Sequence, residues 1–282
     1  MKVGIPLFLL RHEQLVPIAE VAEEVGLESV WMPEHLVFPA EIRSRYPYAV
    51  DGVAPIRPET PLLDPLLVLA QIAARTSRLR LGTNVYVLPL RHPLATARLA
   101  TTLDVLSGGR FSFGIGAGWL EEEFAAVGVD FARRGALTRE CVRAMKALWT
   151  EEVPSFRGKT FAFGPVRFEP KPVQKPHPPI LVGGETDAAL RRAATIGDGW
   201  YGVGHAPGTV APQVARLREL LAEAGRADAP FEITVSTSAA ALDREALVRF
   251  AEAGVHRVVA LPWTRPREAE DALRRFADAV VR

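Results

Sequence analysis

The stretch Ile180-Leu181-Val182-Gly183-Gly184-Glu185-Thr186-Asp187 decides the fold, because a short apolar run passes through two glycines directly into a segment with helical spacing. A run of this length bounded by turn residues is typical of a buried strand. Residues 187–196 repeat apolar positions every three to four residues, and Asp187 is a residue type that starts helices. A strand that leads directly into a helix is part of a βαβ unit, so the sequence predicts a parallel sheet.

The same alternation recurs along the chain. The predicted strands cover residues 3–8, 29–33, 79–85, 110–116, 180–183, 199–203, 232–237 and 257–261. The predicted helices cover residues 14–25, 65–75, 93–106, 138–149, 187–196, 212–224, 244–253 and 267–281. Strands that are each followed by a helix, eight times over, predict an α/β protein with the architecture of a (β/α)8 TIM barrel. Length alone allows one or two domains of about 150 residues, and the alternation favours a single barrel domain over residues 1–282.

Two long excursions interrupt the alternation, one after strand 2 (residues 36–63) and one before strand 5 (residues 152–179). Connections of this length in a compact barrel are usually functional. We expect both at the barrel rim, and the first over the carboxyl-terminal face because it follows a strand. The second is interpreted either as a functional lid or as a structural or dimer-facing hairpin.

The composition excludes several classes of protein. The chain has 34 Lys+Arg against 33 Asp+Glu, and 48% of its residues are hydrophobic, so it has enough apolar residues for a core and no charge excess for nucleic acid. Cys141 is the only cysteine, which excludes an internal disulfide. No run approaches the ~18–20 apolar residues that span a bilayer. We expect a soluble, cytoplasmic protein without a membrane or nucleic-acid partner.

The residues at the predicted strand ends limit the chemistry, because barrel enzymes build their active sites there. No lysine ends a strand, which disfavours Schiff-base chemistry. Only Glu34, His35 and His205 could ligate a metal at these ends, so no metal site is predicted. A mouth lined by aromatic rings and backbone suits a planar cofactor that carries its own reactivity.

Glycines at two strand ends indicate close approach of a ligand. Gly183 and Gly184 run through Glu185 and Thr186 into a helix, so bare backbone amides at a helix N-terminus can face a phosphate. The alternative is a tight turn with nothing bound. At strand 4, Gly114, Gly116 and Gly118 resemble a dinucleotide fingerprint, but Trp119 stands where the pattern needs glycine. We interpret these glycines as a place where a ligand approaches the backbone.

His35 directly follows Glu34 at the end of strand 2. An isolated histidine is more often a hydrogen-bonded structural residue than a catalyst. Its position at a barrel strand end reverses that preference. The sequence therefore predicts His35 as a proton-transfer group.

Several motifs occur together and in a fixed order along the first 200 residues. They are Ser29-Val30-Trp31-Met32-Pro33-Glu34-His35, Leu81-Gly82-Thr83-Asn84-Val85, Leu88-Pro89-Leu90-Arg91-His92-Pro93, Leu106-Ser107-Gly108-Gly109-Arg110, Gly114-Ile115-Gly116-Ala117-Gly118-Trp119, Pro178-Pro179-Ile180-Leu181-Val182-Gly183-Gly184 and Gly197-Asp198-Gly199-Trp200. With these motifs the chain resembles the luciferase-like monooxygenase superfamily, and within it the oxidoreductases that use the deazaflavin coenzyme F-420.

The resemblance implies a barrel with a flavin-like ring across its mouth, a small-molecule substrate and a homodimer. It implies that Glu34 and His35 lie beside the ring as the catalytic residues, with Glu34 orienting His35 or contacting the ring. It also implies a bulge behind the ring at Asn84-Val85, often with a cis peptide bond. The implied cofactor-binding residues are Thr83, Asn84, Val85, Gly116, Ala117, Gly118, Gly183, Gly184, Glu185 and Thr186.

The leading interpretation is an oxidoreductase that transfers a hydride between coenzyme F-420 and a small organic substrate. The second is an FMN-dependent monooxygenase that uses O₂ and reduced flavin from a partner flavin or deazaflavin reductase, and the third is a non-catalytic flavin-binding barrel. Trp119 stands where some deazaflavin enzymes carry a carboxylate, which argues against a sugar-phosphate dehydrogenase. A basic rim for the anionic deazaflavin tail is predicted from four arginines. These are Arg43, Arg45, Arg57 and Arg91.

Overall fold

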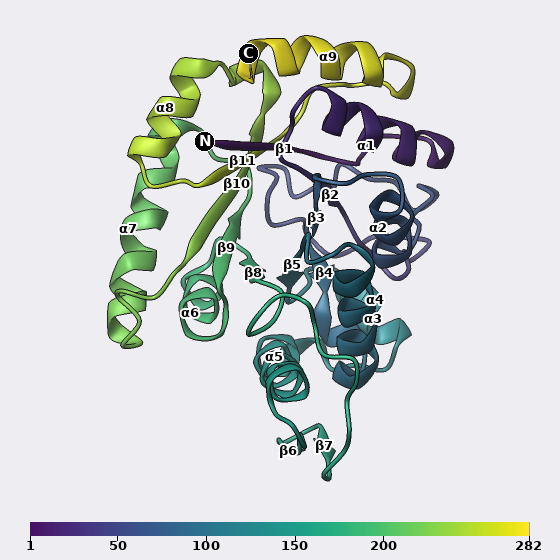
Figure 1. Cartoon of the computed structure of the whole chain (residues 1–282), viewed down its shortest axis with the longest axis vertical. Coiled ribbons are helices and arrows are strands. Elements are labelled where there is room, and N and C mark those ends of the chain that lie inside the picture. Colours follow the sequence, from purple (N-terminus) through teal and green to yellow (C-terminus); the bar gives the residue numbers. More distant parts are fainter. Residues whose placement is uncertain (282) are drawn as a thin grey trace.

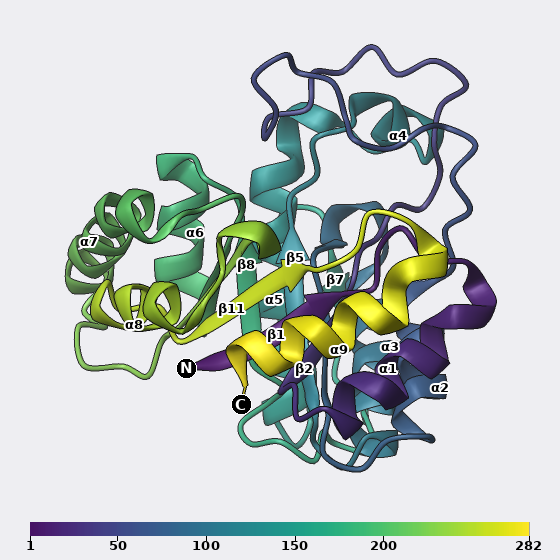
Figure 2. The same ribbon diagram turned by 90° about the horizontal axis from the view of Figure 1, so that it is seen from above.

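A closed ring of parallel strands forms the centre of the protein in the computed structural model, which describes residues 1–281 (Figures 1 and 2). The ring strands are β1 (Lys2–Pro6), β2 (Ser29–Met32), β3 (Arg80–Thr83), β5 (Phe111–Gly116), β8 (Ile180–Gly183), β9 (Gly199–Gly202), β10 (Glu232–Ser238) and β11 (Arg257–Leu261). Each ring strand pairs in parallel with its neighbours, and the pairings β1–β11 and β3–β5 close the ring. The predicted (β/α)8 TIM barrel is confirmed.

Helices surround the ring, as Figure 1 shows. They are α1 (Leu15–Glu24), α2 (Pro65–Ala73), α3 (Pro93–Leu106), α4 (Glu121–Ala126), α5 (Arg134–Thr150), α6 (Asp187–Ile196), α7 (Pro207–Glu223), α8 (Arg244–Glu252) and α9 (Ala269–Val280). Short 3-10 turns cover His12–Gln14, Leu88–Leu90, Phe131–Arg133, Ala239–Ala241 and Pro266–Glu268. Among the described residues, no helix is long and apolar enough to cross a membrane.

Three helices differ from the sequence prediction. Helix α7 begins at Pro207 instead of residue 212, and Pro212 lies inside it. Proline is favoured in the first turn of a helix, because the N–H that it lacks has no acceptor there. The sequence pattern therefore allowed the helix to begin at either Pro207 or Pro212. Helix α5 begins at Arg134, four residues earlier than predicted, and α4 was not predicted because six residues are too few to establish a period.

The predicted strand 79–85 ends at Thr83. The following peptide bond Asn84–Val85 is cis, as the resemblance implied, and the chain then forms the two-residue strand β4 (Tyr86–Val87) beside β5. The glycines of β5 make room for this bulge. A Cβ on Gly116 would lie 2.5 Å from Val85 Cγ2, and one on Gly114 would lie 1.8 Å from the carbonyl oxygen of Thr83.

A tryptophan fills the middle of the barrel. Trp31 has no exposed surface and packs with Leu181, Tyr201 and Val259, and Val85 covers this cluster. Position 82 must be glycine, because a Cβ there would lie 2.3 Å from Cε3 of the Trp31 indole. The barrel is therefore a packed core without a pore, and ligands can reach only its ends.

A buried ion cluster closes the amino-terminal end of the barrel. The guanidinium of Arg257, whose side chain is 1% exposed, binds both oxygens of Glu28 at 2.7 and 2.8 Å and also contacts Glu232. Burial raises the pKa of both carboxyls, but contact with Arg257 outweighs it and holds each pKa below its ordinary value. The cluster joins β10 and β11 to the turn before β2.

The second excursion does not cover the mouth. It contains a small antiparallel hairpin, β6 (Phe156–Arg157) and β7 (Ala162–Phe163), which projects at the lower end of Figure 1. Glu140 of α5 accepts the N–H groups of Thr160 and Phe161, both at 2.7 Å. The tip of the hairpin therefore lies against the outer side of α5, and of the two interpretations the structure favours a structural hairpin.

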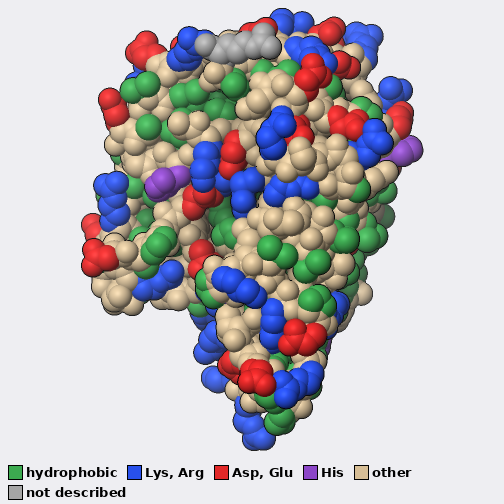
Figure 3. Space-filling model, in the orientation of Figure 1, with side chains coloured by type: hydrophobic (Ala, Val, Ile, Leu, Met, Phe, Trp, Pro, Cys, Tyr) green, Lys and Arg blue, Asp and Glu red, His purple; other side chains and the backbone are tan. Residues whose placement is uncertain are grey.

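The surface in Figure 3 carries Lys and Arg side chains interspersed with Asp and Glu. This mixture is in line with the near-neutral net charge of the sequence, +1. On the face that the figure displays, the charges alternate in sign instead of forming a single-sign field.

Candidate active site at the carboxyl ends of the strands

The first excursion lies at the carboxyl-terminal end of the barrel, as predicted, and Figure 2 shows it above α4. Glu122 of α4 holds it in place. The Glu122 carboxylate accepts the N–H of Arg43 at 2.7 Å and the Oγ–H of Ser44 at 2.6 Å. Burial raises the pKa of Glu122, but these hydrogen bonds outweigh it and bring the pKa down to about 2. The excursion is therefore anchored to the element that follows β5.

His35 is held by a glutamate from α4. Its Nδ1 lies 2.9 Å from Oε2 of Glu123, whose side chain is 1% exposed. The other oxygen of Glu123 accepts the N–H groups of Leu36 and Val37, so the carboxylate is fixed on both sides. Within the described chain, Nε2 of His35 has no hydrogen-bond partner, and the His35 side chain is 13% exposed. Since a carboxylate only accepts hydrogen bonds, it places a proton on Nδ1 and leaves Nε2 for a ligand.

Aromatic rings of the first excursion surround this histidine. The rings of Phe38 and Trp119 lie 4.6 and 5.7 Å from the His35 ring, and Tyr46 contacts Trp119 at 5.1 Å. A mouth with aromatic walls was expected from the sequence. These rings limit the access of water to His35.

Glu34 has a different position from the one predicted. It is fully buried, accepts the N–H of Val87 at 2.7 Å and pairs with Arg91 at 2.7 Å. Burial raises its pKa, although Arg91 opposes this. The prediction that Glu34 orients His35 is wrong, because the Glu34 oxygens are occupied by Arg91 and by the N–H of Val87 in β4, whereas a contact of Glu34 with the ring stays a prediction. Glu123 orients His35 instead, and the run Glu121-Glu122-Glu123 after β5 does not by itself single out this residue.

The bulge residues divide between core and mouth. Thr83 is fully buried and its hydroxyl donates to the carbonyl oxygen of Gly114 at 2.6 Å, and contact of Thr83 with a cofactor stays a prediction. Asn84 donates to the Tyr201 hydroxyl at 3.4 Å, and its Oδ1 is buried without a partner among the described residues. Val85 is partly exposed above the barrel cluster.

The glycines of β5 serve the packing of the protein itself. Val85 fills the space beside Gly116. Gly118 has φ +86°, and a Cβ at this position would lie 2.6 Å from Cε2 of the Phe124 ring. Glycine is therefore needed at these positions for the packing of the protein itself, and the approach of a ligand to this backbone is not tested by it. Ala117 lies between them and is partly exposed. Contact of this backbone with a cofactor stays a prediction.

The turn after β8 has the geometry expected of an anion site. Gly184 has φ +118°, and its carbonyl oxygen accepts Nε1–H of Trp200 at 2.8 Å. Thr186 is the N-cap of α6 and accepts the N–H of Ala189. The first N–H groups of a helix have no acceptor within the helix, so they remain available to a ligand. Gly183, which ends β8, is buried beside Val85.

The side chain of Glu185 turns away from this helix end. Oε1 accepts the N–H of Val203 at 2.7 Å, and Oε2 lies 2.9 Å from Nε2 of His205. Because the carboxylate is occupied by these two groups, only the backbone of Glu185 is available to an anion.

These features fit a flavin or a deazaflavin. The buried Oδ1 of Asn84, in the bulge after β3, has no partner among the described residues and could accept a hydrogen bond from a ring with polar edges. The turn after β8 also fits a cofactor phosphate. Gly184 has no Cβ that would shield the backbone amides at the N-terminus of α6. No group of three or more His, Cys, Asp or Glu arranged for a metal ion occurs within residues 1–281.

The arginines of the predicted basic rim differ in their contacts. Arg91 is tied to the buried Glu34, and the exposed Arg43 is paired with Glu41 at 2.9 Å. Arg45 contacts the carbonyl of Asp51 at 3.5 Å, and Arg57 is exposed. The basic rim for a cofactor tail stays a prediction.

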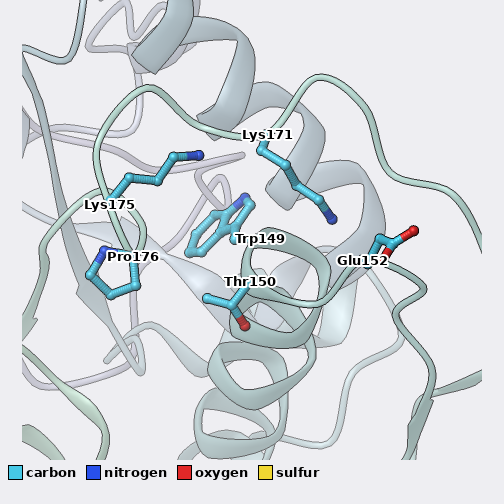
Figure 4. Close-up of a pocket in the computed structure, with 6 residues that line it drawn as sticks. All are labelled: Trp149, Thr150, Glu152, Lys171, Lys175 and Pro176. Carbon is cyan, nitrogen blue, oxygen red and sulfur yellow. The ribbon is translucent and has the colours of Figure 1, made fainter.

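A separate hollow of about 280 Å³ lies at the opposite end of the barrel (Figure 4). It is lined by Trp149, Thr150, Glu152, Lys171, Lys175 and Pro176. The Lys171 ammonium donates to the carbonyl oxygens of Leu148 and Glu151 at 2.7 and 2.6 Å, so it caps the C-terminus of α5. The hollow belongs to the packing of the second excursion.

Comparison with known proteins identifies the family. A model of the luciferase-like monooxygenase family matches residues 10–278. The chain belongs to this family. The luciferase-like family contains oxidoreductases and monooxygenases that use F-420 or FMN. The crystal structure of the monooxygenase RslO1 from Streptomyces bottropensis has a TM-score of 0.79 at 25% identity and covers 100% of this chain and 99% of that chain.

Among the relatives of this luciferase-like protein, one is named as F-420-dependent and another as FMNH(2)-dependent. An uncharacterised protein of Mycobacterium tuberculosis is 37% identical over 257 residues, which cover 90% of this chain and 88% of the relative. An F-420-dependent glucose-6-phosphate dehydrogenase of Kineococcus radiotolerans is 34% identical over 232 residues, 79% of this chain and 62% of that enzyme. An FMNH(2)-dependent dimethylsulfone monooxygenase of Pseudomonas putida is 32% identical over 159 residues, 55% of this chain and 44% of that enzyme.

Proposed function

We propose that the protein is an oxidoreductase that transfers a hydride between coenzyme F-420 and a small organic substrate, with His35 as the proton-transfer group. The observation that carries this proposal is the fixed His35–Glu123 pair, 2.9 Å apart, which leaves Nε2 of the partly exposed His35 without a hydrogen-bond partner among the described residues. A positioned imidazole next to a carboxylate is suited to take or give a proton at physiological pH. Hydride transfer to or from a carbon–oxygen or carbon–carbon bond needs such a group.

The cofactor would lie across the mouth, with its phosphate at the backbone of Gly183, Gly184, Glu185 and Thr186. Asn84 and Val85 would support the ring from below, and Ala117 would line its edge. When bound, a deazaflavin supplies a ring carbon that exchanges a hydride, whereas the protein supplies position and a proton path. His35 accepts the proton at Nε2 when the substrate is oxidised and donates it when the substrate is reduced. Glu123 stabilises the charged imidazolium in either direction.

The sequence relatives support F-420 more than FMN. The F-420-dependent relative aligns with 79% of this chain, and the FMNH(2)-dependent one with 55%. The second candidate is an FMN-dependent monooxygenase, which the Pseudomonas relative favours. In that case a partner reductase would have to supply reduced flavin. The homodimer implied by the resemblance stays a prediction.

Replacement of His35 by alanine tests the proposal. We expect turnover to fall by about 10²- to 10⁴-fold, because a general acid–base group is lost, while the affinity for the cofactor changes by less than about threefold. Turnover would be followed as the change in F-420 absorbance, and affinity by fluorescence titration. If affinity falls and turnover of the bound complex stays normal, His35 positions the cofactor and the proton-transfer assignment is rejected.

A further inference from the structure

One arginine near the turn after β8 has no anionic partner. Arg192 lies on the second turn of α6, and its side chain reaches α5, where Nη1 is 3.2 Å from the position of a Cβ on Gly135. Its Nε is buried without a hydrogen-bond partner in the described part of the chain. Burial lowers the pKa of Arg192, and the positive charges of Arg139 and Arg134 lower it further. Arg192 is therefore a partly desolvated cation that no carboxylate of residues 1–281 pairs with at ion-pair distance.

Tyr48 links this cation to the turn. The Tyr48 hydroxyl, from the first excursion, lies 3.9 Å from the position of a Cβ on Gly184. The charge of Arg192 also acts on Tyr48. Arg192 therefore lies on the helix that begins at this turn, and its guanidinium is beside the first turn of α5. An anion that extends from a phosphate at Gly184 along α6 would approach it.

Two neighbouring arginines of α5 lie near Arg192, and a third arginine, on α6, points away from it. Arg139 is exposed on α5, and the guanidinium of Arg134 stacks on Phe131 at 3.8 Å. Arg191, next to Arg192 on α6, points to the other side and pairs with Glu223 of α7 at 2.8 Å. The net positive charge between α5 and α6 therefore comes from Arg134, Arg139 and Arg192.

We propose that Arg192, together with Arg139 and Arg134, binds the anionic extension that a deazaflavin cofactor carries beyond its phosphate. This inference rests on the proposed function and gives it a source of cofactor specificity. FMN ends at its phosphate, so an arginine beyond the phosphate turn contributes only to the affinity for a cofactor with an anionic tail. A desolvated guanidinium forms stronger contacts with carboxylate and phosphate oxygens than a hydrated one.

The test compares three ligands: coenzyme F-420 with its full tail, the deazaflavin that lacks phosphate and tail, and FMN. Dissociation constants are measured by fluorescence quenching at about 50 and 200 mM salt, because exposed charges are screened over this range. Arg192→Gln is expected to weaken F-420 binding about tenfold, to reduce its salt dependence, and to leave the other two ligands within about twofold. Arg139→Gln, at an exposed position that does not endanger folding, should weaken F-420 binding by about threefold or more.

Arg191→Gln is the matched control, since it removes the same charge from the same helix and should leave all three affinities unchanged. Equal weakening of FMN and F-420 by Arg192→Gln would overturn the inference, because Arg192 would then serve the phosphate or the fold. Unchanged F-420 affinity in both the Arg192 and Arg139 variants would overturn it as well. If the wild-type protein binds the two deazaflavins equally, the subsite is rejected while the proposed cofactor stands. If it binds neither, the proposed function and the subsite are both rejected.

Discussion

At the scale of single residues, the central feature is a histidine whose two ring nitrogens have different surroundings. Nδ1 of His35 contacts the carboxylate of Glu123, whose side chain is 1% exposed, whereas Nε2 has no hydrogen-bond partner among the described residues. The carboxylate cannot turn, because the backbone of Leu36 and Val37 holds its other oxygen. A buried and fully hydrogen-bonded partner of this kind fixes both the tautomer and the ring orientation of a histidine.

Glu123→Gln tests this arrangement. The amide would keep the shape and still accept the N–H of Leu36, but its NH₂ group would donate to Nδ1 and move the imidazole proton to Nε2. We expect kcat to fall by about 10- to 1000-fold with cofactor affinity nearly unchanged, and Glu123→Asp to recover part of the loss. Glu121→Gln, at an exposed position of the same helix without a side-chain hydrogen bond among the described residues, is the control. A normal kcat in folded Glu123→Gln would show that Glu123 has only a structural role.

His35 could be predicted from the sequence, but its partner could not. A histidine at the end of a predicted barrel strand is visible from strand periodicity alone. Glu123 lies 88 positions away, on a six-residue helix, and only the packing of the first excursion brings the two together. Glu34 was assigned the partner role because it is adjacent in sequence, whereas in the structure its carboxylate pairs with Arg91, 57 positions along the chain.

At the scale of elements, the turn between β8 and α6 is constrained from two sides. Gly184 has a positive φ, and a Cβ on it would lie 2.8 Å from Cβ of Ala189. Any side chain at position 184 therefore pushes on α6 as well as on the backbone amides of the turn. A single substitution here would mix a loss of stability with a loss of cofactor affinity.

The double variant Gly184→Ala/Ala189→Gly separates the two effects. Gly184→Ala alone should lower the free energy of unfolding by about 1–3 kcal/mol, through backbone strain and the clash with Ala189. The second substitution removes the clash, so the double variant should recover part of the stability and still bind the cofactor more weakly than the control Ala189→Gly. Denaturant unfolding and cofactor titration measure the two quantities. Equal cofactor affinity in the double variant and Ala189→Gly would reject the turn as the phosphate site.

The anchor of the first excursion can be tested in the same way. Ser44→Ala removes the hydroxyl that donates to Glu122 and accepts the N–H of Glu121, so residues 36–63 should open more often. We expect cleavage in limited proteolysis to accelerate by about 5- to 30-fold, corresponding to about 1–2 kcal/mol. Thr60→Ala, whose hydroxyl accepts only the nearby N–H of Arg57, is the control. Equal cleavage of both variants would contradict the anchoring role of Glu122.

Most helices and strands could be predicted from the sequence, because their periodic segments are long and capping residues mark their ends. Helices α3 and α6 have the predicted bounds, and each begins after a residue whose side chain accepts a backbone N–H. The break after β3 could not be predicted from periodicity, because the alternation of Leu79, Leu81, Thr83 and Val85 continues through it. The bulge depends on the space beside Gly116, which belongs to a different strand.

At the scale of the whole molecule, the cluster around Arg257 couples the stability of the barrel to pH. The pKa values of Glu28 and Glu232 are lower in the folded protein than the ordinary value of 4.5. Their contribution to stability is therefore complete above pH 4.5 and is lost as the pH falls through the lowered pKa values. Acid unfolding should begin in this range.

Arg257→Met leaves two carboxylates without their partner at the closed end of the barrel. We expect a loss of about 3–5 kcal/mol at neutral pH and a smaller loss near pH 4, where the carboxyls begin to take up protons. Arg249→Met, which removes an exposed partner of Glu245 on α8, should change stability little. Urea unfolding at several pH values measures both variants. A loss for Arg257→Met that does not depend on pH would contradict the account of this cluster.

The family and the barrel determine where a ligand binds, and the identity of the cofactor determines the reaction. The most direct measurement is a pair of fluorescence titrations of the wild-type protein, with coenzyme F-420 and with FMN, at one fixed salt concentration. We predict a dissociation constant of about a micromolar or less for F-420, about −8 kcal/mol, and clearly weaker binding of FMN. Tight binding of FMN, weak binding of F-420 and O₂-dependent oxidation of an organic substrate would contradict the account and favour an FMN-dependent monooxygenase.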